Sequence, residues 1–560
     1  MKRILLGLLP FWDPQIPPLG IACLKSYLQK KGFSVRGVDS NLEEEFRELH
    51  DAYFAVLRKQ IPKERAGNLF NIGNQVMRNH MMAHLNKTDR RRYLELLDIL
   101  IVNTFFFHLE VPVLMELDDI IGTFYSRLET YLLDLLKEEQ PAVLGLTVYG
   151  DTLPASVFAF RLAKRHFPGI ETVMGGGVFS DQLAQGSPNL DYFVRREGRY
   201  IDKIIVGEGE LLMGRYLAGD LNNGQKVVGL RDIGNITMDV DTAEIPDFSD
   251  FDLRFYPYLA HYAARSCPFQ CTFCSETVNW GKYRKKEINR SVAEFIELYH
   301  RHSYQVFLMT DSTLNPIVSH LAREFIDSGV SIYWDGFLRA DRHVCDPDNT
   351  LLWRRGGFYR AKLGLESGSQ RVLDLMNKKI TLQQSEAALA SLAYAGIKTT
   401  TFWLFGHPGE TEEDFQQTLD FVEANKDNIY EADCNAFNYF LSGQVNSDEW
   451  IKDKSIKLLY PEWATEMLVS QTWVLDKPPL REESYNRLNR FIEHCARLGV
   501  PNPYSLNDVF QADERWRCLH QNAVPALVDL KDRDLYVDES RAVGELSFAS
   551  GGEQDDDQWL

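Results

Sequence analysis

The sequence predicts an α/β protein built around two parallel sheets. The first is an N-terminal doubly wound (Rossmann-like) parallel sheet with a helical insertion. The second is a full or partial (β/α) barrel, followed by a mixed C-terminal region. A chain of 560 residues is too long for one hydrophobic core. Short apolar runs alternate with amphipathic helical segments over residues 1–218 and again over 259–445, and a polar linker-like stretch, 219–258, separates them.

The N-terminal region alternates strands and helices in the manner of a doubly wound sheet. Predicted strands are residues 3–9, 33–39, 142–148, 170–177, 191–194 and 202–206, and predicted helices are 19–32 and 153–167. Ligands of such sheets bind beyond the carboxyl ends of the strands. The segments to consider are therefore residues 10–20, 147–153, 175–177 and 207–210.

A long insertion, about residues 41–139, interrupts this alternation. It is rich in Leu, Phe, Glu and Arg and is expected to be helical. An insertion of this length in a compact sheet domain is typical of a lid, a substrate-binding element or an interface. A helical pad covering one face of the sheet is an equally good interpretation.

The second region predicts a parallel barrel core over residues 259–445, with its chemistry at the C-terminal strand ends. Predicted strands are residues 304–311, 331–341, 359–367, 397–406 and a segment around 434–440, and predicted helices are 291–302, 316–328, 369–376, 381–395 and 411–425. Residues 446–545 mix helices and turns and are expected to form a substrate-related region. The acidic end, residues 546–560, is expected to be disordered.

Composition excludes several classes of function. A formal net charge of -19 argues against broad nucleic-acid binding, which needs a basic surface. The apolar run at the N-terminus is short and lacks a signal-peptidase site, and the longest later run, residues 96–109, is interrupted by polar residues and is too short to span a membrane. We therefore expect a cytoplasmic protein without a membrane span. In that compartment thiols stay reduced, which excludes a disulfide knot.

Three of the eight cysteines lie in one octapeptide, as Cys267, Cys271 and Cys274. Structural zinc sites need four ligands, and no fourth Cys or His follows closely. A 4Fe–4S cluster held by three thiolates leaves one iron open for an exogenous ligand. Phe269 and Phe273 would shield such a cluster from water. The spacing favours a cluster over a zinc knuckle or a chance grouping.

The stretch AARSCPFQCTFC resembles the signature loop of radical S-adenosylmethionine (SAM) enzymes, and the match extends to residues 363–381 and 402–422. The resemblance implies that the three Cys hold the cluster and that SAM binds its open iron. It also implies that a reductant such as flavodoxin or ferredoxin supplies one electron, so that SAM yields a 5′-deoxyadenosyl radical. By position in the motifs, the expected SAM contacts are Phe273, Asp311, Ser312, Glu366, Ser367 and Gly406.

Two of these positions have a purely structural alternative. Glu366 could form an ion pair with Arg339 at the barrel mouth. The turn at Gly406 could simply join a strand to a helix, with Glu410 and Thr411 capping the helix start.

Residues 1–218 resemble the cobalamin-binding domain that precedes the barrel in one radical SAM subgroup. The resemblance rests on PPLGIACLKSYLQKKGFSVRGVD, VLGLTVYGD, ETVMGGGVFS and IIVGEGE. A helix start and glycines at strand ends also suit a polar ligand or a large flat ring. Expected cobalamin contacts are Pro18, Leu19, Gly20, Thr147, Tyr149, Gly175, Gly176, Gly177, Gly207 and Glu208. The Asp-x-His-x-x-Gly motif is absent, so no cobalt ligand can be named, and a domain that has lost the cofactor is the alternative.

The resemblance implies a radical SAM enzyme that methylates an unactivated carbon of a small-molecule, lipid or peptide substrate through methylcobalamin. The alternative is a non-methylating rearrangement, cyclisation or oxidation, with cobalamin auxiliary or absent. A sensor or scaffold protein is disfavoured by the intact three-Cys loop. Methylthio transfer to RNA is disfavoured because it would need a second three-Cys cluster.

Overall fold

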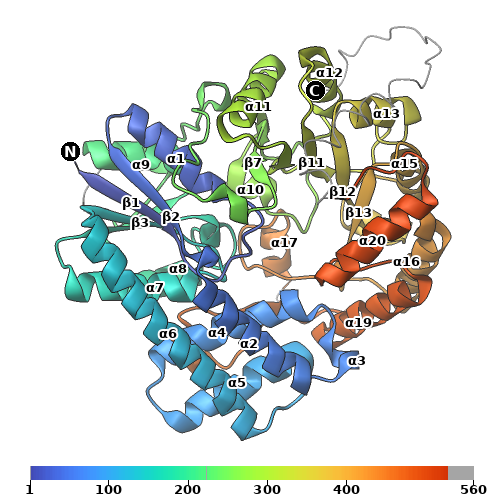
Figure 1. The fold of residues 1–560 in the computed structure, drawn as a ribbon. Coiled ribbons are helices and arrows are strands. Elements are labelled where there is room, and N and C mark those ends of the chain that lie inside the picture. The colour runs from blue at the N-terminus through green and yellow to red at the C-terminus, as the bar shows by residue number, and fades with distance from the viewer. Residues whose placement is uncertain (1, 222–223, 454, 527–560) are drawn as a thin grey trace.

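The computed structural model describes residues 2–221, 224–453 and 455–526. Its framework is two six-stranded parallel sheets that lie side by side (Figure 1). The order of the first is β2-β1-β3-β4-β5-β6, and the order of the second is β14-β13-β12-β11-β10-β7. Both parts of the predicted fold class, a doubly wound sheet and a parallel barrel-like sheet, are therefore confirmed.

The first sheet reverses its strand order between β1 and β3, which is the switch point where ligands of such folds bind. Its strands are β1 (Arg3–Leu8), β2 (Ser34–Asp39), β3 (Val143–Thr147), β4 (Glu171–Gly175), β5 (Lys203–Val206) and β6 (Val227–Gly229). Its crossover helices are α1 (Leu19–Lys30), α7 (Leu153–His166), α8 (Pro188–Glu197) and α9 (Gly209–Ala218). The strand β6 falls inside residues 219–258, so part of the predicted linker completes this sheet.

The predicted strand at residues 191–194 is wrong, because this segment lies inside α8. Ser187 caps the helix by accepting a hydrogen bond from the backbone N–H of Leu190, and a proline occupies the first turn. Leu190, Phe193 and Glu197 are buried at helical spacing. The cap and this periodicity outweigh the strand propensity of the short aromatic run.

The insertion is helical, as predicted. Its helices are α2 (Glu44–Gln60), α3 (Lys63–Ala66), α4 (Leu69–Asn86), α5 (Arg90–Phe105) and α6 (Val111–Glu139). Figure 1 shows them below the first sheet, with α3 reaching α19 (Arg481–Leu498) of the C-terminal region. The central helix α4 packs against α5, α6 and α7 and against α18 (Thr465–Leu468). The insertion therefore covers the sheet and also joins it to the C-terminal region.

The second sheet is an open, partial barrel whose strands follow one another in chain order. They are β7 (Leu259–His261), β10 (Val306–Met309), β11 (Tyr333–Leu338), β12 (Phe358–Glu366), β13 (Lys398–Phe405) and β14 (Glu431–Ala436). The helices are α11 (Ile288–His302), α12 (Val318–Ser328), α13 (Pro347–Arg355), α14 (Gln370–Leu375), α15 (Leu382–Tyr394) and α16 (Glu412–Asn425). The helix α13 was not predicted. It is started by Asp346, whose side chain accepts from the N–H of Asp348, and by Pro347 in the first turn.

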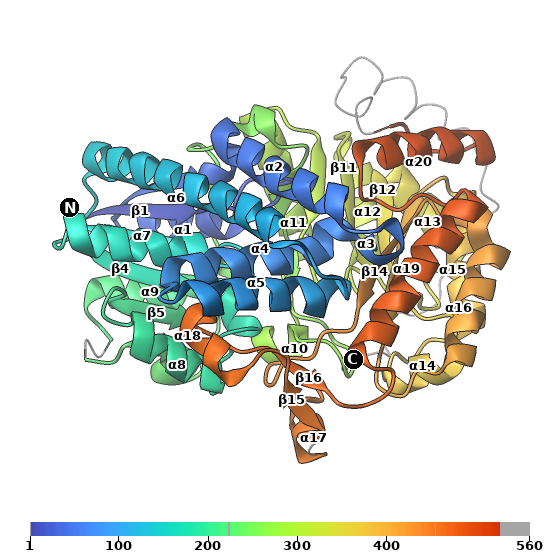
Figure 2. The same cartoon turned by 90° about the horizontal axis from the view of Figure 1, so that it is seen from below.

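Three short elements, two strands and one helix, flank the three-Cys loop, and a hairpin with four helices follows the barrel in the described residues. They are β8 (Ala264–Arg265), β9 (Arg284–Lys285), α10 (Glu276–Trp280), α17 (Ser447–Lys452), β15 (Ile456–Leu458), α18 (Thr465–Leu468), β16 (Trp473–Leu475), α19 (Arg481–Leu498) and α20 (Leu506–Leu519). Figure 2 shows the β15–β16 hairpin below the junction of the two halves. The predicted disordered tail, residues 546–560, lies outside the described residues.

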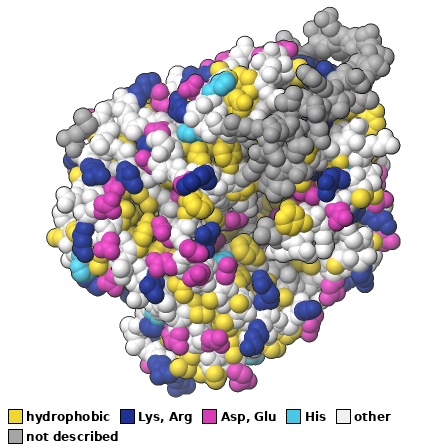
Figure 3. All heavy atoms as spheres, in the orientation of Figure 1, with side chains coloured by type: hydrophobic (Ala, Val, Ile, Leu, Met, Phe, Trp, Pro, Cys, Tyr) yellow, Lys and Arg dark blue, Asp and Glu magenta, His cyan; other side chains and the backbone are white. Residues whose placement is uncertain are grey.

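On the face seen in Figure 3, acidic and basic side chains are interspersed with scattered hydrophobic ones. Among the described helices, none is both long and apolar enough to cross a bilayer.

Candidate functional site

The three predicted cluster ligands lie on one loop at the carboxyl edge of the barrel sheet. The loop runs from β8, directly after β7, to α10. All three thiols are free and half-buried. Burial raises the pKa of Cys274 to about 11, and the charges of Glu276, Cys271 and Cys267 act in the same direction. The pKa of Cys267 is raised by the same causes, burial first and then Cys271. The thiols are thus near enough to repel one another as thiolates.

The loop is held by hydrogen bonds to three segments that follow barrel strands. The backbone N–H of Thr272 donates at 3.0 Å to the carbonyl of Met376, the C-cap of the helix α14 that follows β12. The hydroxyl of Thr272 lies 3.3 Å from Nε2 of His407, in the turn after β13. In the segment after β14, Gln444 Nε2 donates to Phe273 O at 2.9 Å. The Cys loop is therefore positioned by three segments at once, which is the arrangement that a preorganised site requires.

The chemistry of the donor set fits a 4Fe–4S cluster. Such clusters are ligated by Cys thiolates, each on a different iron, and three half-buried thiols on a rigid loop supply them. In the part of the chain that the structure describes, no group of three or more His, Cys, Asp or Glu side chains is arranged to hold a metal ion.

Arg339 is a functional candidate that the sequence reading assigned only as a partner for Glu366. Its Nη1 lies 3.7 Å from Cys271 Sγ, and its guanidinium carbon lies 4.1 Å from the ring centroid of Phe269. Its Nη2 is buried without a partner among the described residues. The structural alternative for Glu366, an ion pair with Arg339, is wrong, because Glu366 binds Lys378 at 2.6 Å instead. The sequence did offer one signal for this role, because Arg339 directly follows the strand β11 and so lies at the carboxyl edge of the sheet.

Asp311 and Ser312 come close to the Cys loop, but both are engaged in internal hydrogen bonds. The Asp311 carboxylate accepts from the backbone N–H of Ala263 at 3.2 Å and of Ala264 at 2.5 Å. Burial nevertheless raises the pKa of Asp311 to about 7. Ser312 donates to Glu276 on α10. In this geometry both side chains support the segments on either side of the loop.

Glu366 and Ser367, at the end of β12, differ in orientation. Glu366 has a left-handed backbone (φ 68°) and forms its ion pair with Lys378, whose Nζ lies 5.9 Å from the ring centroid of Phe273. Ser367 is buried, and its hydroxyl lies 3.3 Å from Thr418 Oγ1 on α16. Glu366 therefore lies on the side of the Cys loop, through Lys378. Ser367 instead contacts the helix α16 that packs against the strand.

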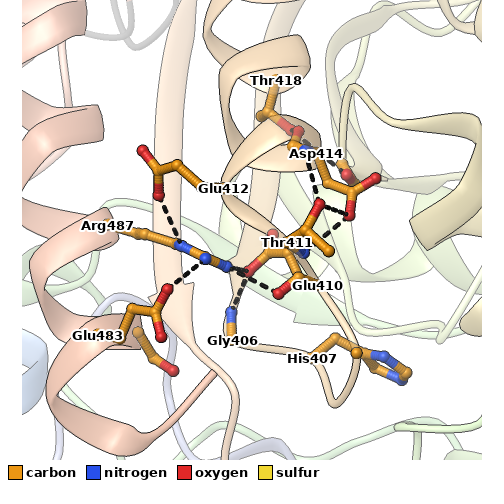
Figure 4. Close-up of polar contacts among 12 residues, drawn as sticks. Gly406, His407, Glu410, Thr411, Glu412, Asp414, Thr418, Glu483 and Arg487 are labelled. Atoms are coloured by element: carbon orange, nitrogen blue, oxygen red, sulfur yellow. Dashed lines mark hydrogen bonds and ion pairs between the residues drawn. The ribbon is translucent and has the colours of Figure 1, made fainter. Parts of the chain in front are cut away.

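Gly406 begins a turn that is held by a buried carboxylate (Figure 4). Its N–H donates to Glu410 Oε2 at 2.7 Å, and the same oxygen accepts from Arg487 Nη1 at 2.9 Å. The expected role of Thr411 as a cap is confirmed, because it forms a reciprocal capping box with Asp414. The expected capping by Glu410 is wrong: this side chain turns back to Gly406 and Arg487. Burial raises its pKa to about 7.

The predicted cobalamin contacts gather at the carboxyl ends of the first sheet's strands and at the start of α1. They are Pro18, Leu19, Gly20, Thr147, Tyr149, Gly175, Gly176, Gly177, Gly207 and Glu208. A Cβ on Gly20 would meet nothing within 4 Å, so this backbone is open. A Cβ on Gly176 (φ 111°) would lie 2.5 Å from the backbone of Val148, so close strand packing explains this glycine.

Tyr149 and Glu208 already have partners. The Tyr149 ring stacks on Trp12, with centroids 4.1 Å apart, next to the switch point. Glu208 accepts from the N–H of Met238 at 2.7 Å and pairs with Arg265 at 3.4 Å and with Arg284. Glu208 therefore ties the first sheet to the segments flanking the Cys loop. The sequence reading missed this contact, since nothing local signals a pairing between distant residues.

Comparison with protein families identifies the second domain. Residues 262–422 match the model described as the radical SAM superfamily. This range is a radical SAM domain. The matched range contains the three-Cys loop and ends in α16, so it covers most of the barrel sheet.

Curated relatives of this chain carry the names of enzymes with different reactions. It is 28% identical over 302 residues to an anaerobic magnesium-protoporphyrin IX monomethyl ester cyclase of Rubrivivax gelatinosus, covering 50% of this chain and 53% of the relative. It is 25% identical over 313 residues to an uncharacterized methyltransferase of Pyrococcus horikoshii, covering 52% of this chain and 65% of the relative. The chain thus matches about half to two-thirds of the length of these relatives.

Solved structures share the complete two-domain fold. The radical SAM methyltransferase TsrM from Kitasatospora setae, solved with cobalamin and a [4Fe-4S] cluster bound, aligns with a TM-score of 0.56 at 14% identity, over 98% of this chain and 100% of TsrM. A TsrM structure with tryptophan and a SAM analogue aligns with a TM-score of 0.60 at 14% identity, over 97% and 100%. At this identity the likeness establishes the fold.

Proposed function

We propose that this protein is an enzyme that cleaves SAM reductively at a 4Fe–4S cluster held by Cys267, Cys271 and Cys274. The observation that carries the proposal is the rigid three-Cys loop at the carboxyl edge of a radical SAM domain. When bound, the cluster would supply the electron for SAM cleavage and cobalamin would supply a transferable methyl group. The protein's own residues bind, orient and shield these groups.

Within this proposal, the residues around the loop have distinct tasks. Arg339 places a positive charge 3.7 Å from one thiol, which favours the more negative, reduced state of a cluster. Glu366 and Phe273 lie where SAM would meet the loop, and Lys378 orients Glu366. Asp311 supports the strand that enters the loop. Phe269, under the Arg339 guanidinium, limits access of water.

We further propose methylation of an unactivated carbon as the reaction, with cobalamin at the carboxyl edge of the first sheet. The strand order with its switch point and the open backbone at Gly20 support a ligand there. The likeness to TsrM, which is a cobalamin-bound methyltransferase, adds support. The substrate, a small molecule, lipid or peptide, and a flavodoxin- or ferredoxin-type reductant belong to the same proposal. The reducing cytoplasm is the compartment that suits its free thiols.

The second candidate is a non-methylating cyclisation or oxidation, with cobalamin auxiliary or absent. The relative that favours it is the cyclase of Rubrivivax gelatinosus. Both candidate reactions begin with the cleavage of SAM. They differ in whether a methyl group is transferred to the substrate.

Two measurements test the proposal. Anaerobically reconstituted protein should carry about four irons per chain and convert SAM to 5′-deoxyadenosine under reduction. Cys271→Ala should abolish this conversion, whereas Cys518→Ala, at an exposed thiol outside the loop, should not. Unchanged cleavage in Cys271→Ala would overturn the cluster assignment. Retention of corrin absorbance after adding hydroxocobalamin and desalting, with transfer of label from methyl-labelled SAM to the corrin, would favour methylation over the cyclase-type reaction.

A further inference from the structure

A cavity of about 190 Å³ lies between the two halves of the protein. One wall comes from α4 of the insertion and from the loop between β4 and α8. The opposite wall comes from the turns after β13 and β14, and the hairpin around β16 and the start of α19 close it. Residues 437–442 form its longest continuous lining segment. Every structural unit of the chain therefore contributes to this one space.

The cavity adjoins the Cys loop without being part of it. Gly406 and Pro408 line it, and His407 between them touches Thr272 of the loop at 3.3 Å. The lining residue Phe440 donates its N–H to Gln444 at 2.9 Å, and Gln444 binds the backbone of Phe273. Of the expected SAM and cobalamin contacts, Gly406 lines the cavity. The cavity is thus a separate compartment next to the reaction centre.

Three polar atoms in the lining are buried without a partner among the described residues. They are the hydroxyl of Tyr439, the hydroxyl of Ser442 and Oε1 of Gln471. Tyr439 is only 7% exposed. Buried polar groups in folded proteins are almost always hydrogen-bonded, because leaving one unmet is costly. Three such atoms around one space indicate that a bound molecule completes their hydrogen bonds.

The charges of the lining favour an anion. Arg78 pairs with Asp151 at 3.2 Å, and Lys477 pairs with Asp453. Arg481 differs, because its partners in the described part of the chain are the carbonyl of Asn103 at 2.9 Å and the hydroxyl of Tyr485 at 2.8 Å, with no carboxylate.

The acidic lining residue is Asp181, on the opposite wall. Burial raises the pKa of this carboxyl group to about 6, although the nearby charge of Arg78 acts to lower it. The uncompensated positive charge therefore belongs to Arg481. A guanidinium with free donors is the side chain that binds carboxylates and phosphates best.

We propose that this cavity binds the substrate and selects a small anion with a ring-sized apolar body. The anionic group, a carboxylate or a phosphate, would bind Arg481, and the body would lie against Phe437, Tyr439 and Trp473. The volume is below the roughly 300–1,000 Å³ of pockets for drug-sized ligands, which favours a small molecule over a lipid or a peptide. The statement that the bound anion is the substrate rests on the proposed radical SAM function. The statement that the cavity binds a small anion rests only on the lining residues.

Ligand-observed NMR on the intact, anaerobically purified protein tests the inference with 3-phenylpropionate, phenyl phosphate and the neutral 3-phenylpropionamide as probes. At least one anion should bind with a low-millimolar Kd, as expected for fragments of this size, and the amide at least tenfold more weakly. Tighter binding of phenyl phosphate than of 3-phenylpropionate would identify a phosphate site, and the reverse a carboxylate site. Equal binding of acid and amide, or no binding of either anion, would overturn the proposal.

Variants locate the site. Arg481→Gln should weaken anion binding about tenfold, whereas Arg497→Gln, an exposed arginine on the same helix, should change nothing. Tyr439→Phe removes a hydroxyl that has no partner among the described residues, so it should weaken binding several-fold without lowering the melting temperature. This variant decides the matter if Arg481→Gln fails to fold. Unchanged binding in Tyr439→Phe and Ser442→Ala together would refute the site.

The two proposals fail separately. Cys271→Ala should retain probe binding although it loses SAM cleavage, because the cavity does not include the cluster loop. Probe binding without SAM cleavage in the wild-type protein would refute the proposed function and leave the anion site standing. SAM cleavage without probe binding would refute the anion site and leave the proposed function standing.

Discussion

Replacing Arg487 with methionine should destabilise the protein by about 3–5 kcal/mol at pH 8.5, because it leaves Glu410 buried without its cation. Arg487 is 1% exposed and binds Glu410 Oε2 at 2.9 Å and Glu483 Oε1 at 2.5 Å (Figure 4). Glu410 in turn holds the N–H of Gly406, at the edge of the cavity. The barrel and C-terminal region, residues 259–526, should then melt roughly 5–9 °C lower.

The pH dependence follows from the sign of the Glu410 pKa shift. Burial raises this pKa from 4.5 to about 7, while Arg487 and the N–H of Gly406 oppose the rise. A raised carboxyl pKa contributes stability below about pH 4.5 that is lost as pH rises through about 7, a difference of about 3 kcal/mol. Removing Arg487 raises the pKa further. At pH 5.5 Glu410 is largely protonated in both proteins, so the variant should lose less stability there than at pH 8.5.

Thermal unfolding monitored by tryptophan fluorescence at pH 5.5 and 8.5 measures both effects. The matched control is Arg490→Met on the same helix, which breaks an exposed pair with Glu412 and should cost at most about 1 kcal/mol at either pH. Adding Glu410→Gln to Arg487→Met should recover more than half of the loss at pH 8.5. Equal losses at the two pH values, or no recovery in the double variant, would refute the reasoning.

Three further outcomes can be stated briefly. Arg339→Met should lower the reduction potential of the reconstituted cluster by tens of mV, since a cation leaves the vicinity of Cys271; an unchanged potential in EPR-monitored titration would contradict this. Gly406→Ala should cost a few kcal/mol, because φ is 90° and the new Cβ would lie 2.1 Å from Ser484 Oγ; Ser484→Gly should restore part of the melting temperature, leaving the φ strain. Asp311→Ala should reduce iron content per chain, because two backbone N–H groups beside the loop lose their acceptor; full iron loading would show that the loop holds without it.

The fold was predictable to the extent that each element carries its own local signal. The longer strands of both sheets and the helices α1, α7, α15 and α16 follow from alternating apolar runs and helical spacing, whereas the three-residue strands β6 and β7 were not predicted. The error at residues 191–194 arose because a four-residue aromatic run has strand propensity, whereas its Ser-Pro cap lies just outside the run. The secondary structure of a short segment depends on its flanking residues and its packing more than on its own composition.

The site was predictable only where its residues are close in sequence. Cys267, Cys271 and Cys274 share one octapeptide, so their spacing alone indicated the donor set. The cavity, by contrast, joins α4, the β4–α8 loop, residues 437–442 and the start of α19, which only the tertiary fold brings together. Likewise, Glu366 pairs with Lys378 instead of Arg339, and its backbone is left-handed at the strand end. The sequence pattern around Glu366 indicated neither feature.

The Gly-Glu-Gly-Glu turn after β5 shows how a sequence motif can point to the right place for a different physical reason. Glu208 and Glu210 pair with Arg265, at 3.4 and 2.5 Å, two residues before Cys267. These carboxylates are nearly buried, so breaking the pairs should be costly. A reaction between groups carried by two domains depends on a fixed separation, because effective concentration falls steeply with misplacement. Both glutamates therefore hold the carboxyl edge of the first sheet against the three-Cys loop that follows β8.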